Sequence, residues 1–380
     1  MSIYKKALTL HKQNRGKLEI KSKVKLTSHR NLSWAYTPGV AQVSREIYKN
    51  KKTAYDYTIK ANTVAVVSDG SAILGIKETG ALPALPVMEG KCAIFKEFAD
   101  IDAFPICLDT HDTEEIIKAT KLIAPAFGGI NLEDIAAPQC FEIEARLRKE
   151  LDIPVFHDDQ HGTAIVVLAG LLNALKVVKK DLRKIKIVIS GAGASGTATA
   201  KFLLYAGVKD LILTDSRGII YSGRKQGMNP SKRDLAKKTN HNKIKGGLDA
   251  ALKCADVFIG LSRPKVLKPH WIKLMDPDPI VFALANPEPE IMPLSAEKAG
   301  AHVVATGRSD LHNQLNNALA FPGLFRGALD ARLKNISDKV QLKAAHALAS
   351  LVPHPHSHRI VPDVFDKRIV PAIAKAISSS

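Results

Sequence analysis

The feature that most constrains this chain is a glycine-rich turn between an apolar run and a run of small residues. Residues 187–203 read IVISGAGASGTATAKFL, with Gly191, Gly193 and Gly196 spaced as G-x-G-x-x-G. The apolar run predicts a buried strand, and the small residues predict a helix packed closely on it. A second strand-like run, LILTD, ends at Asp215, 19 residues after Gly196. Together these features predict a βαβ unit that binds a dinucleotide.

Each glycine has its own physical task in such a turn. Gly191 lets the chain turn tightly, Gly193 lets the backbone approach a pyrophosphate, and Gly196 lets helix and strand pack closely. Ala194 and Ser195 open the helix, whose N-terminal N–H groups favour the negative charge of the cofactor. These five residues form the first part of the expected cofactor site.

Asp215 bears on which dinucleotide the turn binds. A carboxylate at this place accepts a hydrogen bond from the ribose 2′-OH of NAD and repels the 2′-phosphate of NADP. We therefore expect NAD. Arg217 follows two residues later, and it keeps NADP as an alternative because a cation can accommodate the phosphate.

The length of the chain and its strand pattern predict two domains. A chain of 380 residues exceeds what one hydrophobic core usually holds. From residue 185, apolar runs typical of buried parallel strands alternate with helical segments. We expect an α/β fold with a smaller N-terminal α/β domain over residues 1–160, a Rossmann-like, doubly wound parallel sheet within residues 161–380, and a cleft between the two domains.

The elements expected before and after the glycine turn follow from their apolar patterns. Strands are expected at 63–70, 104–109 and 153–159, and helices at 113–123, 138–151 and 162–178. The later strands are expected at 186–190, 211–215, 256–260, 279–285 and 302–306. The last 50 residues are expected to be helices that close the second domain or fold back on the first.

The composition and charge pattern of the chain argue against a nucleic-acid-binding, membrane-spanning or secreted protein. The net charge is +18, but the basic residues are scattered without an aromatic-interleaved stripe, which favours a solvated surface over a nucleic-acid site. No apolar stretch reaches 18 residues without a charge, so we expect no membrane span. No secretory signal is present, and no C-x-x-C spacing occurs, which predicts a cytoplasmic protein with reduced thiols. The four cysteines are Cys92, Cys107, Cys140 and Cys254.

Two pairs of acids follow apolar runs in the first half of the chain. Glu133 and Asp134 come after a short apolar run, and Asp158 and Asp159 come at the end of an expected strand. Turns after strand ends are where α/β proteins build their sites. Converging carboxylates repel one another, and Mg²⁺ or Mn²⁺ would offset this repulsion. The alternative is that these acids cap helices or pair with Lys and Arg.

Other polar residues allow both a structural and a functional interpretation. His157 and His161 resemble part of a zinc motif, but that motif needs a continuous helix, whereas a strand is expected to end at His157. Lys91 opens an apolar stretch, where it either snorkels to solvent or serves as a desolvated base. Three further candidates precede or follow turns, where most such residues only shape the loop: Tyr36, Asn286 and Asn317.

Taken together, several long and unusual segments make the chain similar to one family. They are AYTPGVA, VVSDG, LPVMEGK, FADIDAFPI, FGGINLEDI, CFEIE, PVFHDDQHGTA, GAGASG, FALANP, ATGRSD and FPGLFRGALD. Over essentially its whole length, the chain resembles the short, prokaryotic type of malic enzyme. It departs from that family at Lys77–Gly80, where relatives usually read GNIG, and SAIL before it lacks the arginine of larger relatives.

The resemblance implies oxidative decarboxylation of L-malate to pyruvate and CO₂, with a nicotinamide cofactor and Mg²⁺ or Mn²⁺. It implies Lys91 as the base, Tyr36 as the general acid, and Asp158 as hydrogen-bond partner of the base. The lysine would be neutral, with a pKa depressed by burial and by the cation. The implied metal ligands are Glu133, Asp134 and Asp159, and the implied substrate contacts are Asn286 and Asn317, with Asn286 also beside the cofactor.

Several alternatives stay open within this interpretation. The enzyme could prefer NADP, or decarboxylate malate to lactate without net redox, or act on oxaloacetate alone. A protein of another class, a catalytically silent one that binds NAD or associates with nucleic acid, is prompted by the charge of +18. Relatives form dimers through the first domain, so the resemblance implies at least a homodimer.

Overall fold

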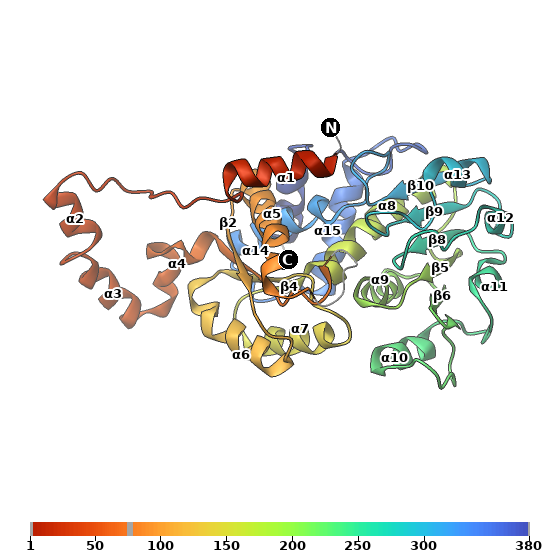
Figure 1. Ribbon diagram of the computed structural model, residues 1–380, viewed down its shortest axis with the longest axis horizontal. Helices are drawn as coiled ribbons and strands as arrows, with labels where there is room; N and C mark the ends of the chain where they lie inside the picture. Colours follow the sequence, from red (N-terminus) through yellow and green to blue (C-terminus); the bar gives the residue numbers. More distant parts are fainter. Residues whose placement is uncertain (1–2, 74–78, 379–380) are drawn as a thin grey trace.

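The computed structural model describes residues 3–73 and 79–378, and within them the chain forms two parallel sheets flanked by helices (Figure 1). The first sheet has the order β2-β1-β3-β4, and all its pairs are parallel. Its strands are β1 (Thr63–Ser68), β2 (Asp102–Cys107), β3 (Gly129–Leu132) and β4 (Val155–His157). The two-sheet α/β architecture expected from the sequence is confirmed, and the boundary at residue 160 stays a prediction.

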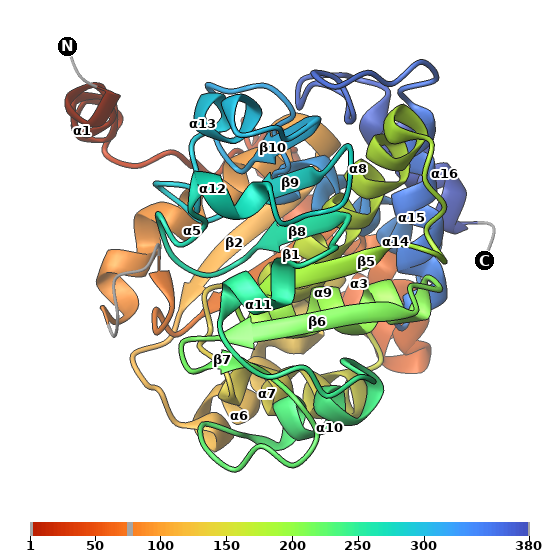
Figure 2. The same ribbon diagram turned by 90° about the vertical axis from the view of Figure 1, so that its right-hand side faces the viewer.

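The second sheet has the order β10-β9-β8-β5-β6-β7, and only β7 is antiparallel to its neighbour (Figure 2). Its strands are β5 (Lys186–Ser190), β6 (Asp210–Asp215), β7 (Gly218–Ile219), β8 (Val257–Gly260), β9 (Ile280–Ala283) and β10 (Val303–Thr306). This is the strand order of a doubly wound dinucleotide fold, with the short β7 in the place of the third strand. The direction of winding reverses between β5 and β8, which is where such folds bind ligands.

Helices cover both sheets. The N-terminal half contains α1 (Ile3–Asn14), α2 (His29–Ala35), α3 (Val40–Lys49), α4 (Ala54–Tyr57), α5 (Ala81–Ala99), α6 (Thr113–Ile123) and α7 (Gln139–Glu150). The C-terminal half contains α8 (Thr163–Val178), α9 (Ala194–Tyr205), α10 (Pro230–Lys238), α11 (Leu248–Leu252), α12 (Pro269–Ile272), α13 (Pro293–Lys298), α14 (Phe321–Asp330), α15 (Asp338–Ser350) and α16 (Ile369–Ser378). Short helical turns occur at Lys51–Thr53, Ile59–Asn62, Ala124–Ala126, Asp158–Gly162 (η5, a π-helical turn) and Asn317–Leu319 (η6).

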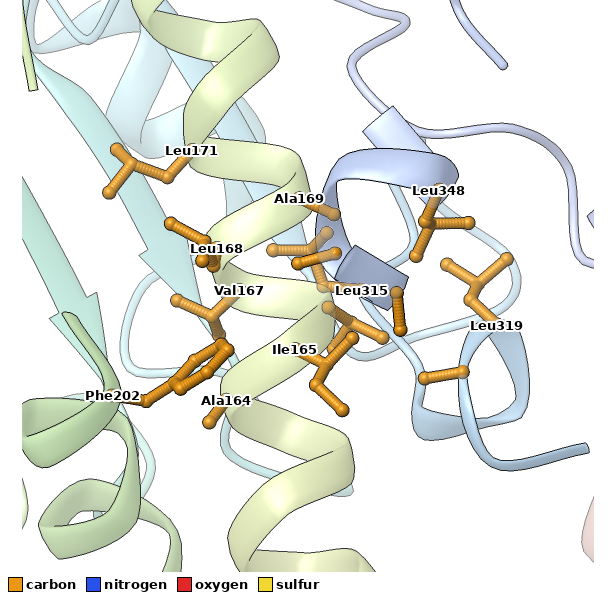
Figure 3. Packing of buried hydrophobic residues seen from close by; sticks show 14 of the residues in the cluster. Ala164, Ile165, Val167, Leu168, Ala169, Leu171, Phe202, Leu315, Leu319 and Leu348 are labelled. Carbon is orange, nitrogen blue, oxygen red and sulfur yellow. The ribbon is translucent and has the colours of Figure 1, made fainter. Parts of the chain in front are cut away.

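Helix α8 lies at the centre of the main hydrophobic core (Figure 3). Leu168 and Leu171 point toward the second sheet, while Leu315, Leu319 and Leu348 pack on the opposite side. The segment Asp158–Val178 is long and apolar enough to cross a membrane, but 67% of its most apolar 18-residue stretch is buried inside the fold. Its apolar character is therefore that of a core helix.

The C-terminal helices fold back on the first domain, one of the two arrangements expected from the sequence. The rings of Phe321 and Phe325 on α14 lie 4.7 and 5.2 Å from the ring of Phe95 on α5, measured between centroids. Arg326 donates to the side chain of Asn62 at 2.6 Å. The two halves of the chain therefore share one continuous core.

Helices α2 and α3 project from this body as an arm joined by an extended segment (Figure 1). Neither helix has a buried residue. Ser28 caps α2 by accepting from the backbone N–H of Asn31 at 3.1 Å, so the helix is formed locally. Local capping without burial makes the arm a separate, solvent-exposed feature of the chain.

Candidate active site

Two pairs of acids lie side by side at the carboxyl edge of the first sheet. Strands β3 and β4 are parallel, with Leu132 opposite His157, so the residues that follow them meet at the same edge. The backbone N–H of Asp134 donates to Asp159 at 2.9 Å. Glu133 and Asp158 are buried. The convergence expected from the two strand ends is therefore present.

Lys91 lies among these acids and does not snorkel to solvent. The buried residues of α5, among them Met88, Cys92 and Phe95, form a stripe at helical spacing, and Lys91 lies on it. Its side chain is only 10% exposed. The ammonium forms ion pairs with Glu133, at 2.9 Å, and with Asp158. It also lies 4.2 Å from the centre of the Phe321 ring.

The protein's own groups keep Lys91 protonated. Burial lowers the pKa of the ammonium, but the charges of Asp158 and Glu133 raise it by more, so the pKa lies well above its ordinary value. The depressed pKa expected from the sequence depends on burial and on a bound cation, and the protein's own groups shift the pKa in the opposite direction. That expectation did not weigh the two ion pairs, with Asp158 and Glu133, against burial.

The chemistry of the cluster fits a divalent cation. Burial raises the pKa of Glu133 well above its usual range, and burial together with the charge of Asp159 raises the pKa of Asp134 to about 8. Such carboxylates need more positive charge than Lys91 alone supplies, and oxygen donors suit Mg²⁺ or Mn²⁺. Within residues 3–73 and 79–378, no three His, Cys, Asp or Glu side chains already surround one point as ligands. Binding would therefore require the carboxylates to reorient.

Asp158 joins the two halves of the site. Its Oδ2 accepts from Lys91 and, at 3.0 Å, from the amide of Asn317, which the second half of the chain supplies. Its other oxygen is buried without a hydrogen-bond partner among the described residues. A Cβ on Gly162 would lie 1.9 Å from this oxygen, so only glycine leaves room for it. Thr163 in turn donates to Asn317 at 3.2 Å.

Glu144 supports the π-helical turn η5, although it was not among the expected site residues. It accepts from the backbone N–H of His157 at 3.2 Å and from the amide of Gln160 at 3.3 Å, and it pairs with His161 at 2.8 Å. The signal was available, because Glu144 lies on the buried face of α7 with Cys140, Ile143 and Leu147. His157 ends β4, as expected, so the two histidines share no continuous helix and the zinc motif is absent.

Asn131 is a second polar residue that the sequence analysis passed over. It lies within the buried strand β3, and its amide donates to Glu133 at 2.9 Å. The second oxygen of Glu133 is therefore held, while the first faces Lys91. A polar side chain inside a fully buried strand was the signal for this role.

The glycine turn has the geometry that the spacing predicts. Gly191 has φ +115°, and a Cβ there would lie 2.2 Å from the carbonyl oxygen of Leu261. A Cβ on Gly196 would lie 2.0 Å from the carbonyl oxygen of Gly191, whereas one on Gly193 would meet nothing within 4 Å. Ala194 opens α9, and Ser195 follows it. The turn is thus closed on its inner side and open on the side where a pyrophosphate would approach.

Asp215 lies at the end of β6, but its carboxylate already accepts four hydrogen bonds from three donors. Arg224 donates to both oxygens at 2.7 and 2.6 Å, Lys232 donates at 2.8 Å, and the backbone N–H of Arg217 donates at 2.9 Å. The side chain is only 8% exposed. A ribose hydroxyl can bind here only if one donor moves aside.

The buried Glu290 stabilises the loops at the carboxyl ends of β8 and β9 in the second sheet. It accepts from the backbone N–H groups of Ser262 and Ala285, at 2.9 and 3.0 Å, and so ties the loops after β8 and β9 together. Asn286, the residue after Ala285, is exposed. A Cβ on Gly307 would lie 3.1 Å from its amide nitrogen, so Asn286 lies beside the loop that follows β10.

Tyr36 is the one expected catalytic residue that this fold leaves outside the cluster. It caps the C-terminus of α2 on the projecting arm and is 66% exposed. Figure 1 shows the arm pointing away from α5, which carries Lys91. The role of general acid that the resemblance implies for Tyr36 is therefore not possible within a single chain of this conformation. Lys77 and Glu78, where the sequence departs from the resemblance, lie outside the described residues.

Comparisons with known proteins agree across the chain. The family model described as the malic enzyme N-terminal domain matches residues 15–117 and 110–148. The model described as the malic enzyme NAD binding domain matches residues 160–379.

Individual relatives cover nearly the whole chain. The bifunctional malic/malolactic enzyme of Bacillus subtilis is 53% identical over 100% of this chain and 93% of that protein. The NAD-dependent malic enzyme of Geobacillus stearothermophilus is 55% identical over 95% of this chain and 76% of that protein. The crystal structure of the NAD-dependent malic enzyme of Thermotoga maritima matches with a TM-score of 0.96 and 48% identity, covering 98% of this chain and 99% of that one.

Proposed function

Because this chain belongs to the malic enzyme family, we propose that it oxidatively decarboxylates L-malate to pyruvate and CO₂ and reduces NAD. One observation carries the proposal. A buried lysine and four carboxylates gather at one sheet edge, and an amide from the dinucleotide-binding half, that of Asn317, reaches the same cluster. This arrangement supports a proton-transfer group that would act beside a nicotinamide bound by the second half of the chain.

Lys91 is the proposed base, and its Nζ takes the proton of the C2 hydroxyl. Asp158 orients it, since the two form a buried ion pair. A divalent cation held by Glu133, Asp134 and Asp159 would offset the carboxylate charge that keeps Lys91 protonated and would act as a Lewis acid toward the oxygens of malate. The low exposure of Lys91, Glu133, Asp134 and Asp158 limits the access of water and strengthens each electrostatic contact.

Two asparagines are proposed to hold the substrate. Asn317 is fixed by Asp158 and Thr163 at the junction of the two halves, so its position is set before malate binds. Asn286 follows β9 at the carboxyl edge of the second sheet, where a nicotinamide and a substrate would meet. Both roles rest on position and on the resemblance.

Tyr36 is proposed as the general acid of a neighbouring chain in a homodimer. The arm exposes Trp34 by 61% and Leu32 by 45%, beside Tyr36 itself. Exposed apolar groups of this kind mark interaction surfaces. A second copy of the chain would cover them and receive Tyr36 into its carboxylate cluster.

Mixing two inactive variants tests this arrangement. Tyr36→Phe lacks the acid and Lys91→Ala lacks the base, so each homodimer is inactive. A hybrid dimer contains one intact site if Tyr36 acts on the partner, and none if it acts within its own chain. Recovery of malate oxidation after the variants are mixed and reassembled supports the proposal, whereas a mixture as inactive as its components refutes it.

NAD is proposed as the preferred cofactor, with NADP used less well. Asp215 keeps its negative charge: burial raises its pKa, and the hydrogen bonds from Arg224 and Lys232 lower it by more, so the pKa lies below its ordinary value. The carboxylate would repel a 2′-phosphate, but its two cations reduce that repulsion. Initial rates with each cofactor and malate measure the preference.

A second activity is favoured by one observation, the 53% identity to a protein named bifunctional malic/malolactic enzyme. Such an activity would convert malate to lactate and CO₂ with no net change in NADH. Measuring lactate, pyruvate and NADH in one reaction separates the two outcomes. Lactate without NADH would identify malolactic turnover.

Purified protein with malate, Mn²⁺ and either nicotinamide cofactor tests the central proposal. NADH and pyruvate in equal amounts are expected, and Lys91→Ala is expected to abolish both while the protein stays folded. If neither NAD nor NADP is reduced and no lactate forms, the proposal is wrong. Salt-sensitive DNA binding without turnover would instead support the alternative of a catalytically silent protein.

All four cysteines are free thiols, which agrees with the proposed cytoplasmic location.

A further inference from the structure

Histidines gather on the C-terminal side of the fold, away from any role proposed above. His312 lies in the loop after β10, and His354, His356 and His358 lie between α15 and α16. Neutral imidazole is the commonest protein ligand of zinc, copper and nickel. The four side chains are exposed, so they are open to ions in solution.

The distance between the ring centres of His312 and His358 is close to that of two imidazoles bound to the same metal ion. The ring centres of His312 and His358 lie 5.4 Å apart, and the ring planes are inclined by 62°. Two imidazoles bound to one tetrahedral ion at nitrogen–metal distances of about 2.0–2.1 Å place their ring centres about 5 Å apart. No hydrogen bond in the described part of the chain engages a ring nitrogen of His312, His356 or His358, so their nitrogens are available as ligands.

The backbones that carry the pair are held by one buried side chain. The Asn313 amide donates to the carbonyl oxygens of Val304 and Ser357, at 2.9 and 2.7 Å, and its oxygen accepts from the N–H of Ile360 at 2.9 Å. Asn313 is next to His312, and Ser357 is next to His358. The separation of the two backbones is therefore fixed, which lowers the ordering cost of bringing the two exposed rings to one ligand.

The space beside the rings suits a partly hydrated ion. A hollow of about 430 Å³ is lined by His312, His356 and His358, with Gln314 and Asp363 among its other residues. No three ligand side chains converge within the described residues, so an ion here would bind the two imidazoles and complete its coordination with water. Arg359 also lines the hollow and opposes a cation, which limits the affinity.

We propose that His312 and His358 form a second metal site, for a borderline transition ion such as Zn²⁺, Ni²⁺ or Cu²⁺. The site is separate from the carboxylate cluster, whose oxygen donors suit Mg²⁺ or Mn²⁺. An ion bound there joins the turn at residues 356–359 to the loop that leads toward Asn317. It therefore stabilises the folded protein and fixes the substrate-binding loop.

Zn²⁺ binding to the full chain tests the proposal, measured by competition with a chromogenic chelator while Mg²⁺ saturates the carboxylate cluster. His312→Ala and His358→Ala are each expected to lose one equivalent of bound Zn²⁺, or to weaken its binding at least about tenfold. His241→Ala, which removes an exposed histidine in the loop after α10, is the matched control and should bind as the wild type does. Zn²⁺ should also raise the Tm of the wild type and the control, but not of the two variants.

Equal Zn²⁺ stoichiometry and affinity in the wild type and both variants would overturn the proposal. So would equal losses in the variants and in His241→Ala, because the binding would then be nonspecific. The readout uses neither malate nor NAD, so its failure leaves the proposed activity untouched. Circular dichroism of each variant shows that the fold is retained.

Discussion

The glycine turn allows a sharp separation of folding from cofactor binding. Gly196 and Gly193 belong to one turn, three residues apart, yet the space around them differs completely. A methyl group on Gly196 would lie 2.0 Å from the carbonyl oxygen of Gly191, whereas one on Gly193 would meet nothing within 4 Å. The variants Gly196→Ala and Gly193→Ala therefore both add a methyl group, one on the closed side of the turn and one on its open side.

Gly196→Ala is expected to destabilise the protein. A carbon atom cannot lie 2.0 Å from a backbone oxygen, so α9 must move away from the turn by more than about 1 Å. Overpacking of this kind costs about 1–3 kcal/mol. At about 2.1 cal/mol/K per residue the unfolding entropy of a 380-residue chain is about 0.8 kcal/mol/K, so each kcal/mol lowers the Tm by about 1.3 °C, and a fall of about 1–4 °C is expected in differential scanning calorimetry.

Gly193→Ala is expected to keep the stability and lose the cofactor. Gly193 has φ −83° and ψ −157°, an extended conformation open to other residues, so the free energy of unfolding should change by less than about 0.5 kcal/mol. The added methyl would occupy the side on which a pyrophosphate approaches the helix N-terminus. We expect NAD binding, measured by titration calorimetry, to weaken at least about tenfold, or about 1.4 kcal/mol.

The pair gives a clear way to refute this reasoning. Wild-type NAD affinity in Gly193→Ala would mean that the pyrophosphate does not lie against the turn. An unchanged Tm in Gly196→Ala would mean that the close approach of Gly191 and Gly196 does not constrain the fold. If both variants lost stability equally, the distinction between the two sides of the turn would be wrong.

Three further predictions concern charges. Lys232→Met should remove one of the hydrogen bonds to Asp215 together with one neighbouring cation, and raise the ratio of kcat/KM for NAD over NADP about tenfold; an unchanged ratio would contradict this role. Glu144→Ala should lower the free energy of unfolding in urea by about 3–5 kcal/mol, because it breaks a buried pair, whereas Glu142→Ala, exposed on the same helix, should change it by less than about 0.5 kcal/mol. Asp215→Asn should lower the Tm at pH 7, because it removes the charge that pairs with Arg224 and Lys232. The difference in Tm between the wild type and the variant should shrink below about pH 4, where the unfolded carboxyl becomes protonated and the depressed native pKa no longer favours the folded state fully. A Tm difference that does not change with pH would show that the ion pairs contribute nothing.

Much of the site was predictable because its parts follow local rules. The glycine spacing predicted a close approach at Gly196 and an open position at Gly193, and both are present. One acid pair followed an expected strand and the other followed a short apolar run, which forms β3; parallel neighbours bring such residues to one edge, so Glu133 and Asp158 both pair with Lys91. The strand expected at 153–159 ends at His157, because the π-helical turn of Asp158 begins there.

The rest depended on contacts between distant segments. Periodicity showed that Lys91 enters an apolar helix, but not that two carboxylates would hold its proton. Asp215 was recognisable at its strand end, yet its saturation by Arg224 and Lys232 depends on how the following loop folds. Strand β3 was missed because four residues containing glycine and asparagine carry a weak pattern. The exposure of Tyr36 follows from an arm with no buried residue, which no local pattern encodes.

The arm formed by α2 and α3 has a consequence for how the enzyme responds to dilution. If the acid of each site comes from a neighbouring molecule, a lone chain is folded but cannot complete turnover. Specific activity then falls when the protein is diluted below its dimer dissociation constant, and it returns on concentration without any refolding. The amount of working enzyme would thus rise more steeply than the amount of chain that a cell makes.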